Sequence, residues 1–194
     1  MSWYDLLNSY FPAEEMKDKR HFEVLLHEKG DIYKKLEKDD YVVLYAEFPD
    51  FLFIDYLIIK EQARGKGLGK TIINKFKKYG KPILIEVEPP TEENPDTLKR
   101  MRFYTRHHFE TVPSIQYYLR SPYSPQKQYM NIMYWAPEKY SDQFIYDKMR
   151  KMYQEIYQYK DQEIYGSGFD DVKDVFTFTY NTNSLSFMNT DKDR

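Results

Sequence analysis

The sequence predicts a mixed α/β (α+β) fold, with a mixed central sheet, flanking helices and a C-terminal helical extension. The first observation behind this is a strand–helix–strand unit. An apolar run at 51–59, a glycine-rich turn and a helical pattern at 68–79 lead into a second apolar run at 81–88. Such a crossover makes its two strands parallel. The second observation is that the other extended segments are joined by tighter turns, which favours antiparallel pairing and therefore a mixed sheet.

The segment before this unit contains three predicted elements. Residues 13–21 read as a short helix, with Pro12 suited to its start. Residues 21–28 alternate between apolar and polar side chains, which predicts a strand. Residues 30–40 are polar and are expected to form turns, whereas 41–48 are β-branched and aromatic and predict a further strand.

The segment after the unit continues the alternation of helix and strand. Gly80 is placed to end the helix that precedes the strand at 81–88. A basic helix is expected over 97–108, with apolar residues at helical spacing. Two further strands are expected, at 114–119 and 129–135.

We expect one domain over 1–137 and a C-terminal extension over 138–194, with Pro137 at the boundary. Within the extension, 141–160 predicts a long helix with its apolar residues on one side. The stretch at 166–194 is polar, and its end is expected to be mobile.

Composition narrows the function classes. The chain has 194 residues, of which 41% are apolar and 31% are charged, as in a soluble globular protein. The net charge of −2 gives no reason to expect nucleic acid or an anionic membrane surface as a partner. There is no run of about 20 apolar residues and no signal-peptide pattern, so the sequence predicts no membrane association and a cytoplasmic location. There is no cysteine, which excludes disulfides, thiolate metal sites and a cysteine nucleophile.

The turn at 62–70 is the most informative stretch of the chain, because Gly65, Gly67 and Gly69 fall within five residues and open a helix. Glycine lets the backbone approach a ligand without a Cβ in the way. The first N–H groups of a helix have no partner within the helix, and they carry the positive end of its dipole. The turn therefore predicts a phosphate-binding site.

Three kinds of phosphate-binding loop are candidates for this turn. A nucleoside-triphosphate loop needs a glycine where Arg64 stands, and no apolar strand ending in aspartate is available to hold magnesium. A dinucleotide loop needs the spacing G-x-G-x-x-G, which this turn does not have. The third is the acetyl-CoA loop, in which Gln62, Gly65 and Gly67 meet the pattern Q/R-x-x-G-x-G/A.

By this motif and its setting the chain resembles the GNAT superfamily of N-acetyltransferases. The stretch 64–69 matches the common form R-G-x-G-[IL]-G, and 57–59 stands where the family has the end of its L-A-V strand. Further along, 102–109 resembles the family pattern R-x-F-Y-x-R-x-G-F. The resemblance covers about residues 20–136 and adds the GNAT acyltransferase fold to the prediction.

The resemblance implies transfer of an acetyl group from acetyl-CoA to an amine of a small molecule or peptide. The implied acetyl-CoA contacts are Leu57, Ile58, Ile59, Gln62, Arg64, Gly65, Lys66, Gly67, Leu68, Gly69 and Lys70. No metal ligands are predicted. The long C-terminal helix is expected to cap the acceptor cleft or to mediate a homodimer. The alternative is a non-enzymatic acyl-CoA-binding module on the same fold.

The catalytic candidates come from the family pattern and from carboxylates on the predicted strands. Tyr104 occupies the tyrosine position of the family pattern, where a phenol can protonate the leaving thiolate. Residue 53, where histone-type members carry the general base, is phenylalanine, so that role cannot be transferred directly. Carboxylates on strands facing the cleft remain, and we favour Glu86 and then Asp55. His108 stands where the family has glycine, at the end of the helix.

Overall fold

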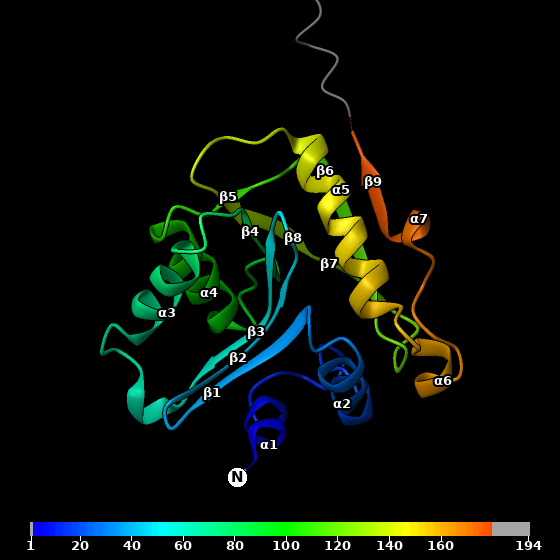
Figure 1. Cartoon of the computed structure of the whole chain (residues 1–194), viewed down its shortest axis with the longest axis horizontal. Helices are drawn as coiled ribbons and strands as arrows, with labels where there is room; N and C mark the ends of the chain where they lie inside the picture. Colours follow the sequence, from blue (N-terminus) through cyan, green and yellow to red (C-terminus); the bar gives the residue numbers. More distant parts are fainter. Residues whose placement is uncertain (1, 180–194) are drawn as a thin grey trace, which may run out of the picture.

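The computed structural model describes residues 2–179 of the chain, and a six-stranded mixed sheet forms its centre (Figure 1). The only parallel pair among the described strands is β3 with β4, and every other pairing is antiparallel, which confirms the predicted mixed sheet. In spatial order the six strands are β1 (Tyr33–Lys38), β2 (Tyr41–Glu47), β3 (Leu52–Ile59), β4 (Ile83–Val87), β8 (Asn131–Trp135) and β5 (Glu110–Thr111).

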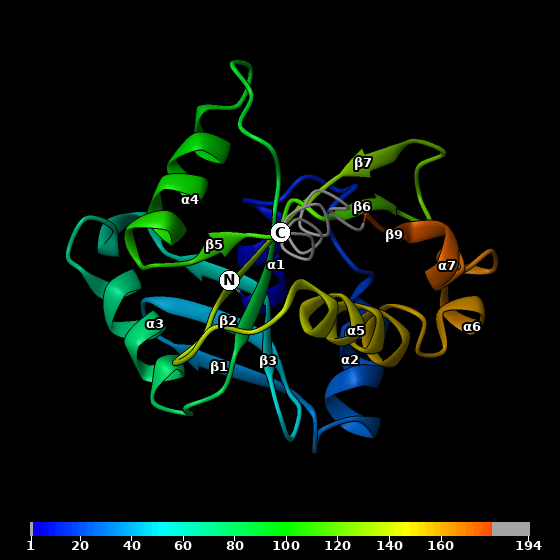
Figure 2. The same cartoon turned by 90° about the horizontal axis from the view of Figure 1, so that it is seen from above.

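A second, smaller sheet carries β6 (Ile115–Arg120) between β7 (Lys127–Tyr129) and β9 (Phe176–Phe178). Because β9 lies in the predicted C-terminal extension and β6 lies before residue 137, this sheet joins the two parts of the chain. Figure 2 shows it beside α5 (Asp142–Met152), away from α3 (Leu68–Lys77).

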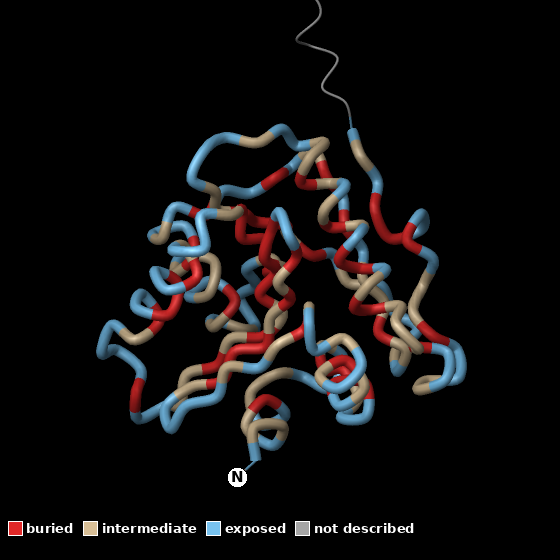
Figure 3. The backbone as a smooth tube through the Cα atoms, in the orientation of Figure 1, coloured by how far each residue is buried: buried red, intermediate tan, exposed pale blue. Residues whose placement is uncertain are grey.

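The two faces of the large sheet are covered by different helices. Successive strand residues point to opposite faces, and on β2 the side chain of Val43 packs with α3 and with α4 (Pro95–Arg106). Its neighbours Val42 and Leu44 pack with α1 (Trp3–Asn8), α2 (Lys19–Glu28) and α5. The buried residues therefore concentrate along the strands and the inner sides of the helices (Figure 3).

The strand predicted at 21–28 is wrong, because these residues belong to helix α2. His21, Phe22 and Leu25 share its buried face at helical spacing, so the apolar alternation in the sequence was coincidental. Asp18 caps the helix by accepting a hydrogen bond from the backbone of Arg20. The helix predicted at 13–21 is also wrong, since turns occupy 13–15 and α2 begins only at Lys19.

Residues 30–40, predicted as turns, contain strand β1. This strand lies at the edge of the large sheet, and only Tyr33 among its residues is buried. Edge strands of natural proteins are often charged, which discourages pairing with other chains. Its polar composition, with lysines at 34, 35 and 38, hid the strand from a prediction based on apolar residues.

Two elements predicted in the C-terminal half differ in the structure. The strand predicted at 129–135 is two strands, β7 and β8, which lie in different sheets on either side of Met130. The helix predicted at 141–160 is α-helical only to Met152, and a π-helical turn then covers Tyr153–Tyr157. Beyond it lie α6 (Asp161–Tyr165) and α7 (Val172–Val175).

The extension packs on the same hydrophobic core as the preceding residues, with Ile145, Met149 and Ile156 completely buried. The division at residue 137 stays a prediction. The chain end predicted to be mobile lies largely at 180–194, outside the described residues. None of the helices between residues 2 and 179 is long and apolar enough to cross a membrane.

Candidate active site

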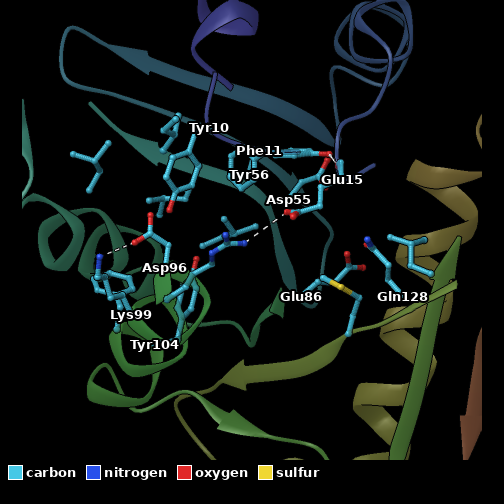
Figure 4. A pocket seen from close by; sticks show the side chains of 18 of the residues that line it. Tyr10, Phe11, Glu15, Asp55, Tyr56, Glu86, Asp96, Lys99, Tyr104 and Gln128 are labelled. Atoms are coloured by element: carbon cyan, nitrogen blue, oxygen red, sulfur yellow. Dashed lines mark hydrogen bonds and ion pairs between the residues drawn. The ribbon is translucent and has the colours of Figure 1, made fainter. Parts of the chain in front are cut away.

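Strands β3 and β4 separate partway along their length and open a cavity in the middle of the sheet. They pair only where residues 52–54 of β3 meet residues 83–85 of β4. Beyond Ile54 the edge of β3 that faces β4 pairs with none of the described strands, although β3 stays paired with β2 as far as Ile59. A cavity of about 370 Å³ lies here, with Leu57, Ile58 and Ile59 on its wall (Figure 4).

Asp55 sits at a bulge in β3. Leu44 of β2 pairs with Tyr56 and Tyr45 pairs with Ile54, so that Asp55 has no partner on β2. Bulges of this kind redirect a side chain.

The carboxylate of Asp55 is held in a buried ion pair. Its oxygens lie 2.8 and 2.9 Å from the Lys17 Nζ, and the Tyr33 hydroxyl donates a hydrogen bond to it at 2.5 Å. The Lys17 and Asp55 side chains are only 1% and 2% exposed. Because Lys17 and Tyr33 already bind both of its oxygens, Asp55 is poorly placed to take a proton from the amine that would receive the acetyl group.

Glu86 on β4 lines the cavity and is held by two phenols. The Tyr117 hydroxyl donates to its Oε1 and the Tyr157 hydroxyl to its Oε2, both at 2.8 Å. The pKa of Glu86 is raised to about 7, mainly by burial; the Lys17 charge and both phenol hydrogen bonds oppose the rise, and the Asp55 charge adds to it. A carboxyl group with such a pKa can accept a proton near neutral pH.

Tyr104 on α4 also lines the cavity, and its ring is buried (Figure 4). Burial raises the pKa of its phenol to about 12, although the Arg100 charge one turn earlier opposes the rise. The phenol is therefore protonated at neutral pH and can act as a donor. Phe53, at the position where histone-type members carry the base, is completely buried in the core on the side of α2 and α5.

A second pair of carboxyl groups lies where the loop after α1 meets the end of β4. The carboxyl groups of Glu15 and Glu88 interact, and Arg100 lies 3.8 and 3.6 Å from them. The pKa of Glu15 is raised to about 8, mainly by burial and also by Glu88, while the Arg100 charge opposes the rise. Of the three, Glu15 and Arg100 line the cavity.

A short 3-10 turn at Glu61–Ala63 connects β3 to the glycine turn. Gly65 and Gly67 adopt φ angles of 76° and 77°, which favour glycine, and Gly67 is the N-cap residue directly before α3. Within residues 2–179 no side chain caps this helix or the short α6, whereas side chains do cap α1, α2, α4, α5 and α7. The N-terminal N–H groups of α3 are thus left open at an exposed turn.

The remaining residues of the turn differ in their surroundings. Arg64 lines the cavity and donates a hydrogen bond to the backbone oxygen of Ile59 at 2.9 Å. Lys66 and Lys70 are exposed, as is Gln62. Gly69 has a packing role, because a Cβ there would lie 2.8 Å from the ring of Phe103 on α4.

His108 has a φ of 62°, so the residue that replaces the family's glycine does take the left-handed conformation at the end of α4. This conformation costs a non-glycine residue about 1 kcal/mol.

Sequence reasoning missed three residues around Glu86, namely Lys17, Tyr117 and Tyr157. They come from the loop before α2, from β6 and from the π turn. None belongs to a motif. A buried lysine and two of twenty tyrosines give no signal until the fold brings them to β4.

Comparison with known proteins establishes the family, although no family model matches the chain. "Putative acetyltransferase YjbC" of Bacillus subtilis (strain 168) is 46% identical over 175 residues, which cover 90% of this chain and 91% of that protein. The chain belongs to the GNAT superfamily of acetyltransferases.

A solved structure supports the fold assignment. "Putative acetyltransferase from GNAT family from Bacteroides thetaiotaomicron" is similar with a TM-score of 0.66 at 23% identity. The match covers 78% of this chain and 87% of that chain. The GNAT fold expected from the sequence is therefore confirmed.

Proposed function

We propose that this GNAT protein transfers an acetyl group from acetyl-CoA to an amine of a small molecule or peptide. The observation that carries the proposal is the cavity between β3 and β4. It combines an unpaired strand edge with Glu86, whose pKa is near 7, and with the protonated phenol of Tyr104. These are the groups that acetyl transfer to an amine requires.

The acetyl-CoA would lie along β3 and across the start of α3. Its pantetheine arm is peptide-like and can hydrogen-bond the backbone of residues 57–59, where β3 does not pair with β4. Its diphosphate suits the uncapped N-terminus of α3, where Gly65 and Gly67 leave room for close approach. Lys66 and Lys70 add positive charge beside it.

In the reaction, Glu86 accepts a proton from the acceptor ammonium, directly or through a water molecule. The neutral nitrogen then forms a bond to the carbonyl carbon of the thioester, the carbon–sulfur bond breaks, and the nitrogen releases its second proton to solvent, which leaves a neutral amide. Tyr104 gives its proton to the departing sulfur and regains one from solvent. Glu86 is half ionised near pH 7, so it can take up a proton and release it again.

The acceptor would enter between the loop after α1 and the β6–β7 side of the cavity. Tyr10, Phe11, Leu119, Met130 and Tyr157 make much of this wall aromatic or aliphatic. This favours an acceptor with an apolar or aromatic portion. The cytoplasmic location and the homodimer stay predictions.

Gly67 provides a test of the acetyl-CoA site. Replacing it with alanine should weaken acetyl-CoA binding at least about tenfold, because the new Cβ projects from the open turn toward the diphosphate. Gly80→Ala is the matched control, since Gly80 has a φ of 67° and open space around it at the other end of α3. Both variants should lose about 1 kcal/mol of stability. Equal acetyl-CoA affinity of the two variants, measured by calorimetry, would contradict the assigned site.

Tyr104→Phe tests the proton donor. We expect kcat to fall about 10- to 1,000-fold with little change in acetyl-CoA affinity, because only the hydroxyl is lost. The measurement is CoA release with a panel of amines. An unchanged kcat would show that another group protonates the sulfur.

The same assay separates the enzyme from a non-enzymatic acyl-CoA-binding module. Phe53 favours the module, because phenylalanine at the family's base position cannot accept a proton. Acetyl-CoA binding without turnover against a broad amine panel would favour the module.

A further inference from the structure

The C-terminal extension contacts the proposed base through a local irregularity in its helix. After Met152 the helix widens into the π turn Tyr153–Tyr157, marked by a hydrogen bond from the backbone N–H of Gln158 to the oxygen of Tyr153, five residues earlier. Turns of this kind are rare, and they occur frequently at functional sites.

The π turn determines which side of the helix carries Tyr157. Met149 is completely buried against the core. In a regular α-helix a residue eight positions later would be rotated by roughly 80° from it. The wider turn reduces the rotation per residue, which brings Tyr157 back toward the side of Met149. There its hydroxyl reaches Glu86 at 2.8 Å.

Glu86 is enclosed by groups from four separate segments. Tyr117 comes from β6 and Tyr157 from the π turn, and each donates to one carboxylate oxygen. The charged groups that act on it are Lys17, from the loop before α2, and Asp55, from β3. Lys17 also lies 3.7 Å from the centre of the Tyr157 ring, so Tyr157 contacts both Glu86 and the cation that stabilises its charge.

We propose that the C-terminal extension supplies a positioning residue to the catalytic centre, where Tyr157, together with Tyr117, holds the Glu86 carboxylate toward the cavity and favours its ionised form. The catalytic part of this inference rests on the proposed function. Both oxygens of Glu86 are fixed by donors, so its orientation is set before an acceptor binds. Donation to the charged form also offsets part of the effect of burial.

The direct test is the titration of Glu86, followed by carboxyl ¹³C NMR on the full-length protein, with the resonance assigned through Glu86→Gln. In Tyr157→Phe the ring remains over Lys17 and only the hydroxyl is lost. The pKa of Glu86 should therefore rise by about one pH unit, because a donor to the carboxylate has been removed. Tyr117→Phe should raise it similarly.

Tyr153→Phe is the matched control. Tyr153 belongs to the same π turn, is fully buried and stacks on Tyr157, but its hydroxyl donates to the backbone oxygen of Asp170 at 2.9 Å. Its loss should reduce stability without moving the titration of Glu86. If Tyr157→Phe leaves the titration where it is in the wild type, or Tyr153→Phe moves it equally, the inference is wrong.

The second measurement is the pH dependence of kcat/KM, with the amine of the panel that supports the fastest CoA release. Because the base must be ionised, kcat/KM rises with pH through the pKa of Glu86, and in Tyr157→Phe this rise should shift upward by about one pH unit. If the pKa of Glu86 rises in Tyr157→Phe but the pH profile of kcat/KM does not shift, Glu86 is not the base. The hydrogen bond from Tyr157 to Glu86 would still be supported. The two failures are thus distinguishable.

Discussion

Replacing Glu86 with glutamine is expected to lower kcat/KM for acetyl transfer by a factor of about 10²–10⁴, because the variant cannot accept a proton from the acceptor ammonium. Burial raises the pKa of Glu86 to about 7, so the wild-type rate should rise with pH through about 7. In Glu86→Gln that rise should disappear, and acetyl-CoA affinity should stay close to the wild-type value. The measurement is the pH profile of CoA release with the best amine of the panel.

Glu47→Gln is the control for this substitution. Glu47 ends β2 and is paired at the surface with Lys34 at 2.8 Å and Lys81 at 3.7 Å. It does not line the cavity, so its loss should leave the rate and its pH profile unchanged. If Glu86→Gln retains wild-type activity, the base must be sought elsewhere, and the Glu15–Glu88 pair is the next candidate because the pKa of Glu15 is raised to about 8.

Replacing Lys17 with methionine is expected to reduce the free energy of unfolding by about 3–5 kcal/mol. The reason is that Asp55 would remain buried without the cation that neutralises it. Replacing both partners, as in Lys17→Met with Asp55→Leu, should recover much of this loss, since no unpaired charge is then buried. Chemical denaturation measures both effects.

Lys19→Met provides the comparison for Lys17→Met. Lys19 lies two residues further along, and its side chain is 58% exposed and paired only loosely with Glu23 at 3.8 Å. Its loss should change stability by less than about 0.5 kcal/mol. A Lys17 variant that is no less stable than the Lys19 variant would contradict the structural role given to the ion pair.

The sequence predicted the glycine turn and the elements on either side of it better than the rest of the fold, for a physical reason. The turn with Gly65 and Gly67 is local: its positive φ angles, its position after a strand and the helix it opens are all written in consecutive residues. The strand and helix patterns on either side are also strongly apolar, so β3, α3 and β4 were predicted nearly at their observed bounds.

The errors arose where local pattern and tertiary context disagree. Residues 21–28 alternate like a strand, but Asp18 caps a helix there. Strand β1 is polar because it forms a sheet edge. The π turn at Tyr153–Tyr157 inserts an irregularity into an otherwise regular helical pattern.

The catalytic surroundings could be predicted only in part. Glu86 and Asp55 were both identified as carboxylates on strands, but their different environments depend on the bulge at Asp55 and on contacts from distant segments. Lys17 lies 38 residues from Asp55, and Tyr157 lies 71 residues from Glu86. Pairings at such separations follow from the fold and not from any local pattern.

We propose that the opening between β3 and β4 binds acetyl-CoA with its thioester beside Tyr104 and Glu86. A crystal structure of the protein with CoA would show this binding mode. We expect the pantetheine arm along residues 57–59, the diphosphate at the start of α3, and the sulfur within about 3.5 Å of the Tyr104 hydroxyl. A CoA molecule bound outside this opening, or a sulfur distant from both Tyr104 and Glu86, would contradict the account.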